Sequence, residues 1–417
     1  MSITHKSGIV VKVELQFAAG LVDVSADVRF MSMQSSQRAR LSNTFDPGRL
    51  VLQLDNKTRK YDPLYAAGPY FSFLRAGRGA QVTITHASAA RTDATWYGET
   101  DRFALDYDKS NKDSVVTLTC VDALSRLSLG VVYAGYDVET DLEVGTIFGQ
   151  PTSGPLGRAY VLQGAAGNAT PTPAYPPGLS GFSSAIMTYD WDITKDHNML
   201  DEYRRIADIE QAPLTSSFTG TVYFWPRHWF KQNTTSATSQ LTVGNGGMPF
   251  QNVQVLFDSD EIITACSMTN ERGDAVVSIN TAGEATYGRR WPSVTYSELP
   301  CESEILNGAS QTVVELRSTE EFRIDQIVIK PQSNTGWLNH GIDLQLLDRI
   351  TVAFTPTKTG SAISEDYFID GITHDVSPDD WTLTYSLMPA NRFDDALPGS
   401  LFIVDSSLVD GAHLVGF

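Results

Sequence analysis

Apolar and polar residues alternate with a period of two through most of the first 130 residues. The alternation is clearest in four short segments bounded by Gly, Pro, Asp or Asn, at residues 9–15, 50–54, 80–86 and 114–121. A period of two is typical of a strand with one buried face, and many short strands separated by turn residues favour a barrel or sandwich over a βα repeat. The pattern therefore predicts an all-β first domain.

The pattern changes in the middle of the chain. Residues 151–180 are rich in Gly, Pro, Ala and Thr and lack apolar periodicity, which predicts a long loop or extended arm. Residues 196–211 have apolar positions at helical spacing, residues 216–228 have a hairpin pattern, and residues 302–316 predict a second amphipathic helix. A strand that ends at Pro331 follows this helix.

Alternation returns over the last 80 residues, at 348–356, 365–376 and 380–387. We therefore expect a fold that is mainly β with an α+β middle, in which two β-barrel-like domains flank an α+β region. The expected division is a first β domain at 1–130, a loop or arm at 131–185, an α+β region at 186–335 and a second β domain at 336–417.

The two β ends share a short module. Residues 79–86 correspond to 347–354, residues 96–108 to 367–376, and residues 114–124 to 380–390. The last pair contains the triplet Thr-Leu-Thr in both copies, although the interval from the preceding glycine is 19 residues in the first copy and 11 in the second. Two interpretations stay open: a true duplication, or a coincidence of the kind that any β-rich chain produces.

A true duplication would have an architectural consequence. Three chains with two similar barrels each could form a ring of six similar units, so that a three-fold object could dock on a six-fold one. Closed rings arise from head-to-tail contacts whose rotation closes. This requirement is structural and needs no catalytic chemistry.

The charge balance restricts the classes of partner. The chain has 31 Lys and Arg against 49 Asp and Glu, for a formal net charge of −18. Such a surface repels phosphate backbones and anionic lipid, so sequence-specific nucleic-acid binding is not expected. No apolar stretch approaches 18 residues and the first residues lack a signal-peptide pattern, so we expect a soluble protein made in the cytoplasm, without a membrane anchor. The three cysteines, Cys120, Cys266 and Cys301, are odd in number and lack zinc-ligand spacing, which argues against a disulfide framework or a zinc site.

One cluster of acids suggests an enzyme. Asp190, Asp192, Asp196 and His197 lie within eight residues beside aromatic side chains, and paired carboxylates are what a glycosidase uses. The alternative is a polar helix start, with Asp196 or Asn198 as the cap and acids favoured near the positive end of the helix. We favour the helix start.

Other candidate sites have simpler explanations as well. Trp225 and Trp229 could stack on sugars, but alternating buried rings on a strand are commoner. Asp258, Asp260 and Glu261 could bind calcium, but the segment lacks the spacing of a calcium loop. The glycine-rich segment 243–250 has neither a following helix nor the Lys-Ser/Thr of a phosphate loop. His374 lies in a strand and is expected to be packed, so we predict no catalytic, cofactor or metal site.

Five segments, in order along the chain, resemble the hub-type minor tail proteins of siphophages, particularly those that infect actinobacteria. The first is residues 45–63, through Leu54, Asp55, Asn56, Arg59, Tyr61, Asp62 and Pro63; the others are residues 116–127, residues 199–227, residues 285–299 with Tyr287, Gly288 and Arg289, and residues 369–390 with Gly371, Ile372, His374, Pro378 and Trp381. Residues 151–180 fall outside the resemblance.

The resemblance implies a fold related to the baseplate hub of contractile phages and to tail-associated hub proteins. It implies a homotrimer at the tail tip of the virion, whose two barrels per chain form a pseudo-six-fold ring. A hexameric distal tail or tube protein would lie above the ring, and a central fibre, a spike or other minor tail proteins below it, while genomic DNA passes through without specific binding. Two other functions stay open: a cell-wall-degrading enzyme that uses Asp190 or Asp192, and a receptor-binding module that uses the aromatic strand or residues 151–180.

Overall fold

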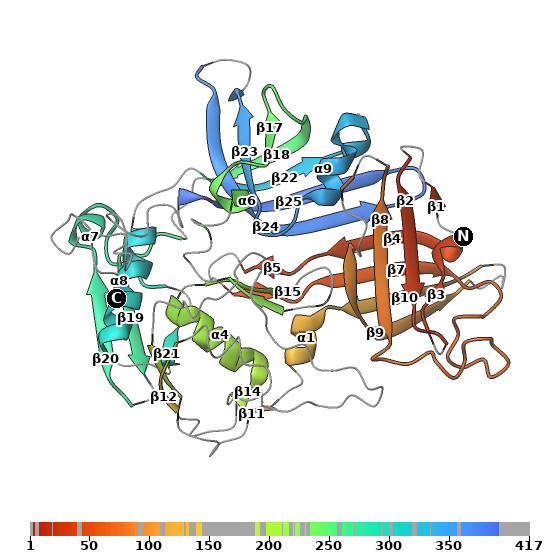
Figure 1. Cartoon of the computed structure of the whole chain (residues 1–417), viewed down its shortest axis with the longest axis horizontal. Helices are drawn as coiled ribbons and strands as arrows, with labels where there is room; N and C mark the ends of the chain where they lie inside the picture. Colours follow the sequence, from red (N-terminus) through yellow and green to blue (C-terminus); the bar gives the residue numbers. More distant parts are fainter. Residues whose placement is uncertain are drawn as a thin grey trace.

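The structure is a computed structural model, and Figure 1 shows the arrangement of its elements. It describes residues 3–143, 188–256 and 261–391, apart from short gaps at 5–7, 19, 40–43, 88, 91–94, 109–112, 129–130, 133–138, 192–196, 211, 217–219, 221, 226–229, 231–233, 271, 293–294, 300–302, 319–322, 334 and 357–359.

Six strands form the first unit of the fold. They are β2 (Val10–Leu15), β4 (Val28–Gln34), β7 (Arg49–Asp55), β8 (Gly79–Thr85), β9 (Trp96–Tyr107) and β10 (Ser114–Val121). Their alternation places every second side chain in one core; in β7, for example, Leu50, Leu52 and Leu54 are buried and the residues between them are not. The four strands predicted from alternation in this part of the chain are thus confirmed.

Six strands of the second half form a second unit. They are β17 (Leu241–Gly244), β18 (Phe250–Leu256), β22 (Arg323–Ile329), β23 (Arg349–Phe354), β24 (Ile363–Val376) and β25 (Trp381–Pro389). β22, β23, β24 and β25 match the strands predicted there. β17, β18 and β22 extend the second unit back into residues 186–335, which the sequence pattern assigns to the middle region.

The two units have the same strand order. With the strands of each unit numbered one to six along the chain, the lateral order is 1-4-5-6-3-2 both for β2-β8-β9-β10-β7-β4 and for β17-β23-β24-β25-β22-β18. Four of the five contacts are antiparallel in both units. The contact of the first strand differs, since β2 is antiparallel to β8 and β17 is parallel to β23.

Two β-bulges also coincide, while a third, at Asp325 in β22, occurs in the second unit only. In the fifth strand the bulged residue is Asp101 in one unit and Asp370 in the other; in the second strand it is Arg29 and Gln251. A bulge bends a strand and fixes its register, so matching bulges are a stronger sign of duplication than matching letters. Aligned by these bulges, the two Thr-Leu-Thr triplets lie in equivalent strands but are offset by two residues.

The fold class is therefore confirmed as mainly β with an α+β middle. The described strand pairings do not close a barrel within the chain. Instead, both units belong to one continuous sheet, because β4 of the first unit pairs with β24 of the second. In Figure 1 the red and orange strands of the first unit meet the blue strands of the second at this contact.

Most of the described helices lie in the middle of the chain. The predicted helix is α4 (Met199–Glu210), which buries Leu200, Tyr203 and Ala207. Its N-terminus is capped by Asn198, whose Oδ1 accepts hydrogen bonds from the backbone N–H groups of Leu200 (2.9 Å) and Asp201 (3.4 Å). The second predicted helix is α8 (Ser303–Arg317), which packs on a small sheet of β19 (Ala265–Asn270), β20 (Ala275–Ile279) and β21 (Tyr296–Leu299).

Shorter elements complete the fold. The predicted hairpin is β15 (Leu214–Ser216) with β16 (Val222–Phe224). The remaining short elements are β1 (Ile3–Thr4), β3 (Val22–Asp23), β5 (Gln37–Arg38), β6 (Phe45–Asp46), α1 (Ala123–Leu127), β11 (Val131–Val132), β12 (Glu139–Glu143), β13 (Thr188–Trp191), β14 (His197–Asn198), α6 (Thr234–Ala237), α7 (Thr281–Tyr287) and α9 (Leu338–Asp343).

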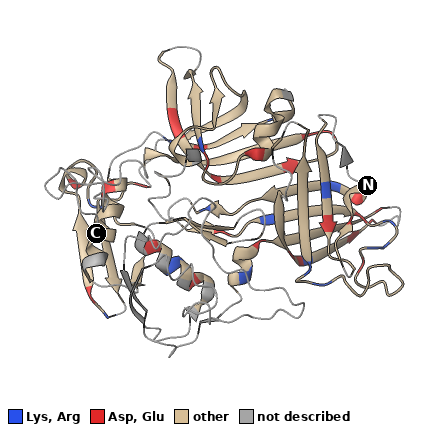
Figure 2. Ribbon diagram, in the orientation of Figure 1, with Lys and Arg blue, Asp and Glu red and all other residues tan. Residues whose placement is uncertain are grey.

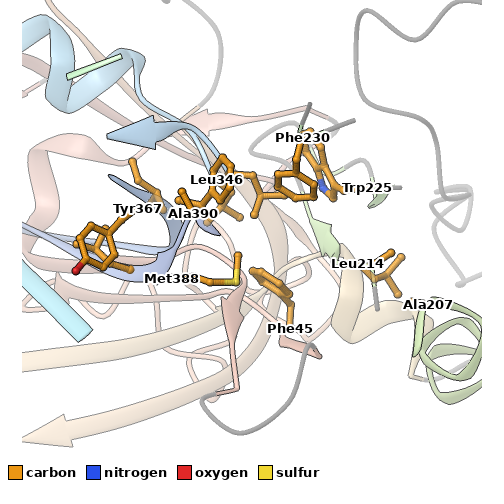
Figure 3. Packing of buried hydrophobic residues seen from close by; sticks show 14 of the residues in the cluster. Phe45, Ala207, Leu214, Trp225, Phe230, Leu346, Tyr367, Met388 and Ala390 are labelled. Carbon is orange, nitrogen blue, oxygen red and sulfur yellow. The ribbon is translucent and has the colours of Figure 1, made fainter. Parts of the chain in front are cut away.

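Each of the two hydrophobic cores includes side chains from the other unit. The core of the first unit includes Leu338 and Ile342 from α9 and Trp381 from β25. The core of the second unit and the middle region includes Leu124 from α1 and Phe45, and Figure 3 shows Phe45 beside Met388 of β25. Each unit therefore depends on the other for part of its packing.

The contact between β4 and β24, which we call the joint, also contains buried polar groups. Ser35 donates its N–H to the carbonyl of Ile372 (2.8 Å), and its Oγ accepts the N–H of the same residue (2.9 Å). The Arg38 Nε donates to Asp370 Oδ2 at 2.9 Å, and the two side chains are only 4% and 6% exposed. The Gln37 side chain donates to Ser386 Oγ (2.8 Å). The joint is therefore held by backbone ladder bonds and by a buried ion pair.

Asp122 supports the first-unit side of the joint. Its carboxylate accepts hydrogen bonds from the N–H groups of Gly48, Leu124 and Ser125 and from the hydroxyl of Ser36. Burial raises the pKa of Asp122 to about 6, against these four hydrogen bonds, which lower it.

We predict that breaking the ion pair of the joint destabilises the whole chain. Asp370→Ala leaves the buried Arg38 without this carboxylate, so the free energy of unfolding should fall by about 3–5 kcal/mol in urea titrations. The double variant Arg38→Met/Asp370→Ala should lose less than the sum of the two single losses. Arg289→Met is the control, because Arg289 and Glu284 form a more exposed pair away from the joint and removal should cost about 0–1 kcal/mol. Equal small losses for Asp370→Ala and Arg289→Met would contradict the prediction.

Asp122 predicts a pH dependence of a defined sign. An unfolded aspartate has a pKa of about 3.9, so the native state with a pKa near 6 binds the proton more tightly, and the stability present below pH 4 is lost as the pH rises through 6. Urea unfolding of wild type and Asp122→Asn at pH 4 and pH 7 should show wild type losing up to about 3 kcal/mol relative to the variant. The exposed Glu365→Gln should leave this difference unchanged. A difference that does not vary with pH, or that varies in the other direction, would refute this role of Asp122.

Candidate functional site: a polar sheet face and two unpaired strand edges

Eight strands form an uninterrupted antiparallel path, in the order β9-β10-β7-β4-β24-β25-β22-β18. One face of this path carries the apolar side chains of the cores. The other face, which we call the polar face, is rich in small hydroxyl and amide side chains. Cross-strand register places together on it Ser32, Gln34, Gln53, Thr117, Thr119, Gln254, Gln326, Thr373, Thr382, Thr384 and Ser386. The apolar residues Phe30, Val51, Val115, Val121 and Val328 lie between them on the same face.

Charged side chains are sparse and mixed in sign on the polar face. Within these eight strands it carries Arg49 and Arg102 as cations and Asp55, Glu99, Asp106 and Asp375 as anions, and Arg29 of β4 is ion-paired with Asp55. Figure 2 shows the strands of both units mostly tan, with isolated blue and red segments. Binding of a phosphate backbone depends on clustered Lys and Arg. The polar face has no such track.

Each end of the eight-strand path is an unpaired edge. β9 pairs with β8 only through Trp96–Glu99 and with β10 through Glu99–Tyr107, so no described strand pairs with the other side of residues 102–107. β18 pairs with β22 on one side and with no described strand on the other. Two exposed apolar side chains lie on these strands, Tyr107 (45% exposed) and Val255 (38% exposed).

The first family-like segment forms the loop beside Tyr107. Asn56 is fully buried, and its Oδ1 accepts the N–H of Tyr61 (2.9 Å). Asp62 is fully buried and accepts hydrogen bonds from Arg59 (Nε, 2.8 Å), Tyr107 (Oη, 2.6 Å) and the N–H of Leu64. Burial raises the pKa of Asp62, but these hydrogen bonds outweigh it and leave the pKa below its usual value. The polar residues of this segment therefore order a loop against the end of β9.

The acidic cluster is only partly described. Asp190 lies in β13, which pairs with β12, and His197 lies in β14, which pairs with β11. Asp192 and Asp196 lie outside the described residues, so the structure does not bring the cluster together as a site. The helix-start interpretation is confirmed for Asn198, which caps α4.

The aromatic and calcium candidates are part of the packing where they are described. Trp225 is buried, and its Nε1 donates to Thr215 Oγ1 at 2.7 Å, so its ring is not a surface for sugars. Glu261 is buried in an ion pair with Arg323 (2.6 Å). Trp229, Asp258 and Asp260 lie outside the described residues. Within the described part of the chain, no group of three or more His, Cys, Asp or Glu residues could hold a metal ion.

His374 is packed, as predicted. It is buried, its ring is stacked on Trp381 with the centroids 6.0 Å apart, and its Nδ1 accepts the Trp381 Nε1–H at 3.3 Å. Cys120 and Cys266 are free thiols in the cores, and burial raises the pKa of both. Cys301 and the arm at 151–180 lie outside the described residues. None of the described helices has the length and apolarity that a bilayer crossing requires.

Sequence reasoning missed the joint and the unpaired edges. Arg38 and Asp370 are 332 residues apart, and no local pattern connects them. The edges follow from the strand order, and the order became visible only when β17, β18 and β22 were assigned to the second unit. The one available signal was the alternation itself, whose hydroxyl-rich positions already mark the polar face.

No protein-family model matches the chain, and no curated protein matches it in sequence. Two solved structures are similar over almost their whole length. The tail protein from Neisseria meningitidis MC58 has a TM-score of 0.58 and 11% sequence identity, over 93% of this chain and 99% of that one. The 43 kDa tail protein of prophage MuSo2 from Shewanella oneidensis has a TM-score of 0.52 and 12% identity, over 92% and 99%. This chain has the fold of these two tail proteins.

Proposed function

We propose that the protein is a structural component of a phage tail, a trimeric hub at the tail tip that adapts one symmetry to another. The observation that carries this proposal is the duplication: one chain contains two units with the same strand order and the same two bulges. Its fold, shared with two tail proteins, supports the assignment to a virion.

The duplication fits a mismatch of symmetry. Three chains with two units each supply six similar units, which match a six-fold ring on one side, while the chain as a whole repeats only three times. The sheet path supports this geometry, because each unit contributes four strands to it and three chains would contribute 24 in all.

The polar face suits the wall of a conduit. Hydroxyl and amide side chains stay hydrated, and few cations are available to hold phosphates, so DNA would pass without being retained. The formal net charge of −18 is consistent with this role. We propose that genomic DNA is a passing, unbound partner.

The remaining partners follow from the same position. A distal tail protein or tail tube ring would lie above the hub, and a central fibre, a spike or other minor tail proteins below it. The protein would be made in the cytoplasm of the bacterial host and assembled without a membrane anchor. The family-like segments suggest a siphophage tail of the kind that infects actinobacteria.

We propose a structural role rather than a catalytic one. The described part of the acidic cluster consists of Asp190 and His197 on two different strand pairs, and no observation favours catalysis by them. Purified protein should therefore produce no clearing on zymograms of host cell walls. Clearing that Asp190→Asn or Asp192→Asn abolishes would show an enzyme instead.

An image of the tail tip tests the hub directly. We expect electron microscopy of virions to show three copies of the chain in one ring, with both units at the same level and with Thr117 and Thr384 facing the central axis. The physical reason is that the joint fixes the two units side by side in one sheet. A monomer at the tip, or a ring that contains only one unit of each chain, would contradict the proposal.

A further inference from the structure

The joint shows how two units of this fold bind each other. The second strand of the first unit, β4, pairs through its outer edge with the distal part of the fifth strand of the second unit, β24. The register is antiparallel, with Met31 opposite Val376, Ser32 opposite Asp375 and Met33 opposite His374.

Each unit has both edges that such a contact needs, the outer edge of its second strand and the distal part of its fifth strand. Within the chain, only the second strand of the first unit and the fifth strand of the second unit are paired in this way. The fifth strand of the first unit, β9, has the equivalent distal part at residues 102–107, and no described strand pairs with it there. The second strand of the second unit, β18, has the equivalent outer edge, and no described strand pairs with it either. The two ends of the eight-strand path are therefore the two complementary edges that a second joint would need.

We propose that these two edges bind each other between chains, so that β18 of one copy pairs with β9 of the next copy. The proposal rests on the hub function proposed above and names the surface through which the copies meet. The bulges fix the register. Met33 and His374 each lie four residues after the bulge of their strand, and so do Val255 in β18 and Leu105 in β9.

The predicted contact therefore places Leu105 opposite Val255. The neighbouring pairs are Ala104 with Leu256, Asp106 with Gln254 and Tyr107 with Val253, in antiparallel order. Two of the exposed apolar side chains of the described residues, Tyr107 and Val255, fall within this short stretch. No two like charges face each other in it, and pairing would satisfy backbone groups that an open sheet edge leaves exposed.

The contact is head-to-tail by construction. A two-fold dimer would bring each edge against itself, whereas this contact joins two different edges and leaves one of each available for a further copy. Along the sheet, β9 and β18 of one chain are separated by seven strand spacings, roughly 34 Å before curvature. Within the chain, β9 and β18 do not pair with each other.

A disulfide test uses the exposed pair Asp106 and Gln254. Directly opposed residues of an antiparallel pair have Cα atoms about 4.5–5.5 Å apart, within the range that a disulfide can bridge. We expect Asp106→Cys/Gln254→Cys, in the full chain and under mild oxidation, to give covalent dimers and trimers on non-reducing gels for more than about half of the assembled protein. An equimolar mixture of the two single variants should give cross-linked dimers, because one chain then supplies each edge.

Three controls make the test specific. Asp106→Cys alone and Gln254→Cys alone should not cross-link, since neither edge meets itself, and a disulfide in either would overturn the head-to-tail contact. Arg102 lies on the same face of β9 as Asp106 but four residues away from it, roughly 13 Å along the strand. Arg102→Cys/Gln254→Cys should therefore not cross-link if the register is right. Wild type reports the background from its own cysteines, of which Cys120 and Cys266 are buried.

The outcome separates the two proposals. If the tail tip contains a three-fold ring and Asp106→Cys/Gln254→Cys does not cross-link in it, the edge contact is wrong and the hub function stands. If the tail tip contains no ring, the hub function fails regardless of the gel. Efficient cross-linking of Asp106→Cys/Gln254→Cys, with no cross-linking of either single variant, supports both the contact and its register.

Discussion

The structure depends on one strand that is shared between two units. β4 pairs with β7 on one edge and with β24 on the other, so a single row of backbone hydrogen bonds turns two sheets into one. A one-residue slip at this point would move every side chain of one unit to the opposite face and exchange the core with the polar face. The register at β4 is therefore the constraint on which the fold, the polar face and the open edges all depend.

The buried polar groups of the joint are best understood as register markers. Replacing an ion pair such as Arg38–Asp370 by apolar side chains would not necessarily reduce stability, because desolvation offsets much of the attraction. Asp370, however, is itself the bulged residue of β24, so the pair forms only when the bulge lies in one place. Apolar packing alone, such as Phe45 against Met388, tolerates more sliding than a hydrogen-bonded pair does.

The sequence predicted the individual elements better than their grouping. Alternation identifies β7, β10 and β25 because each has one fully buried face, and β24 because burial alternates over its last residues. Helical spacing together with Asn198 identifies α4. β18 was missed because neither of its faces is fully buried, which weakens the alternation. The Thr-Leu-Thr triplets pointed to equivalent strands but suggested a register that is offset by two residues, since bulges and not letters set the register. The polar face and the edges are products of pairing across hundreds of residues, for which no local pattern exists.

The differences between the two units determine which symmetry the proposed ring would present to each partner. The first strand is antiparallel to the fourth in one unit and parallel in the other, and the small sheet with α8 is inserted between β18 and β22 of the second unit only. In the proposed ring, the four strands that each unit contributes to the path would repeat six times in approximation, while the insertion would repeat three times. A partner that contacts the shared strands would therefore meet near six-fold symmetry, and a partner that contacts the insertion would meet three-fold symmetry. One duplicated chain with one unduplicated insertion is thus sufficient to present both symmetries, without any change in conformation between the copies.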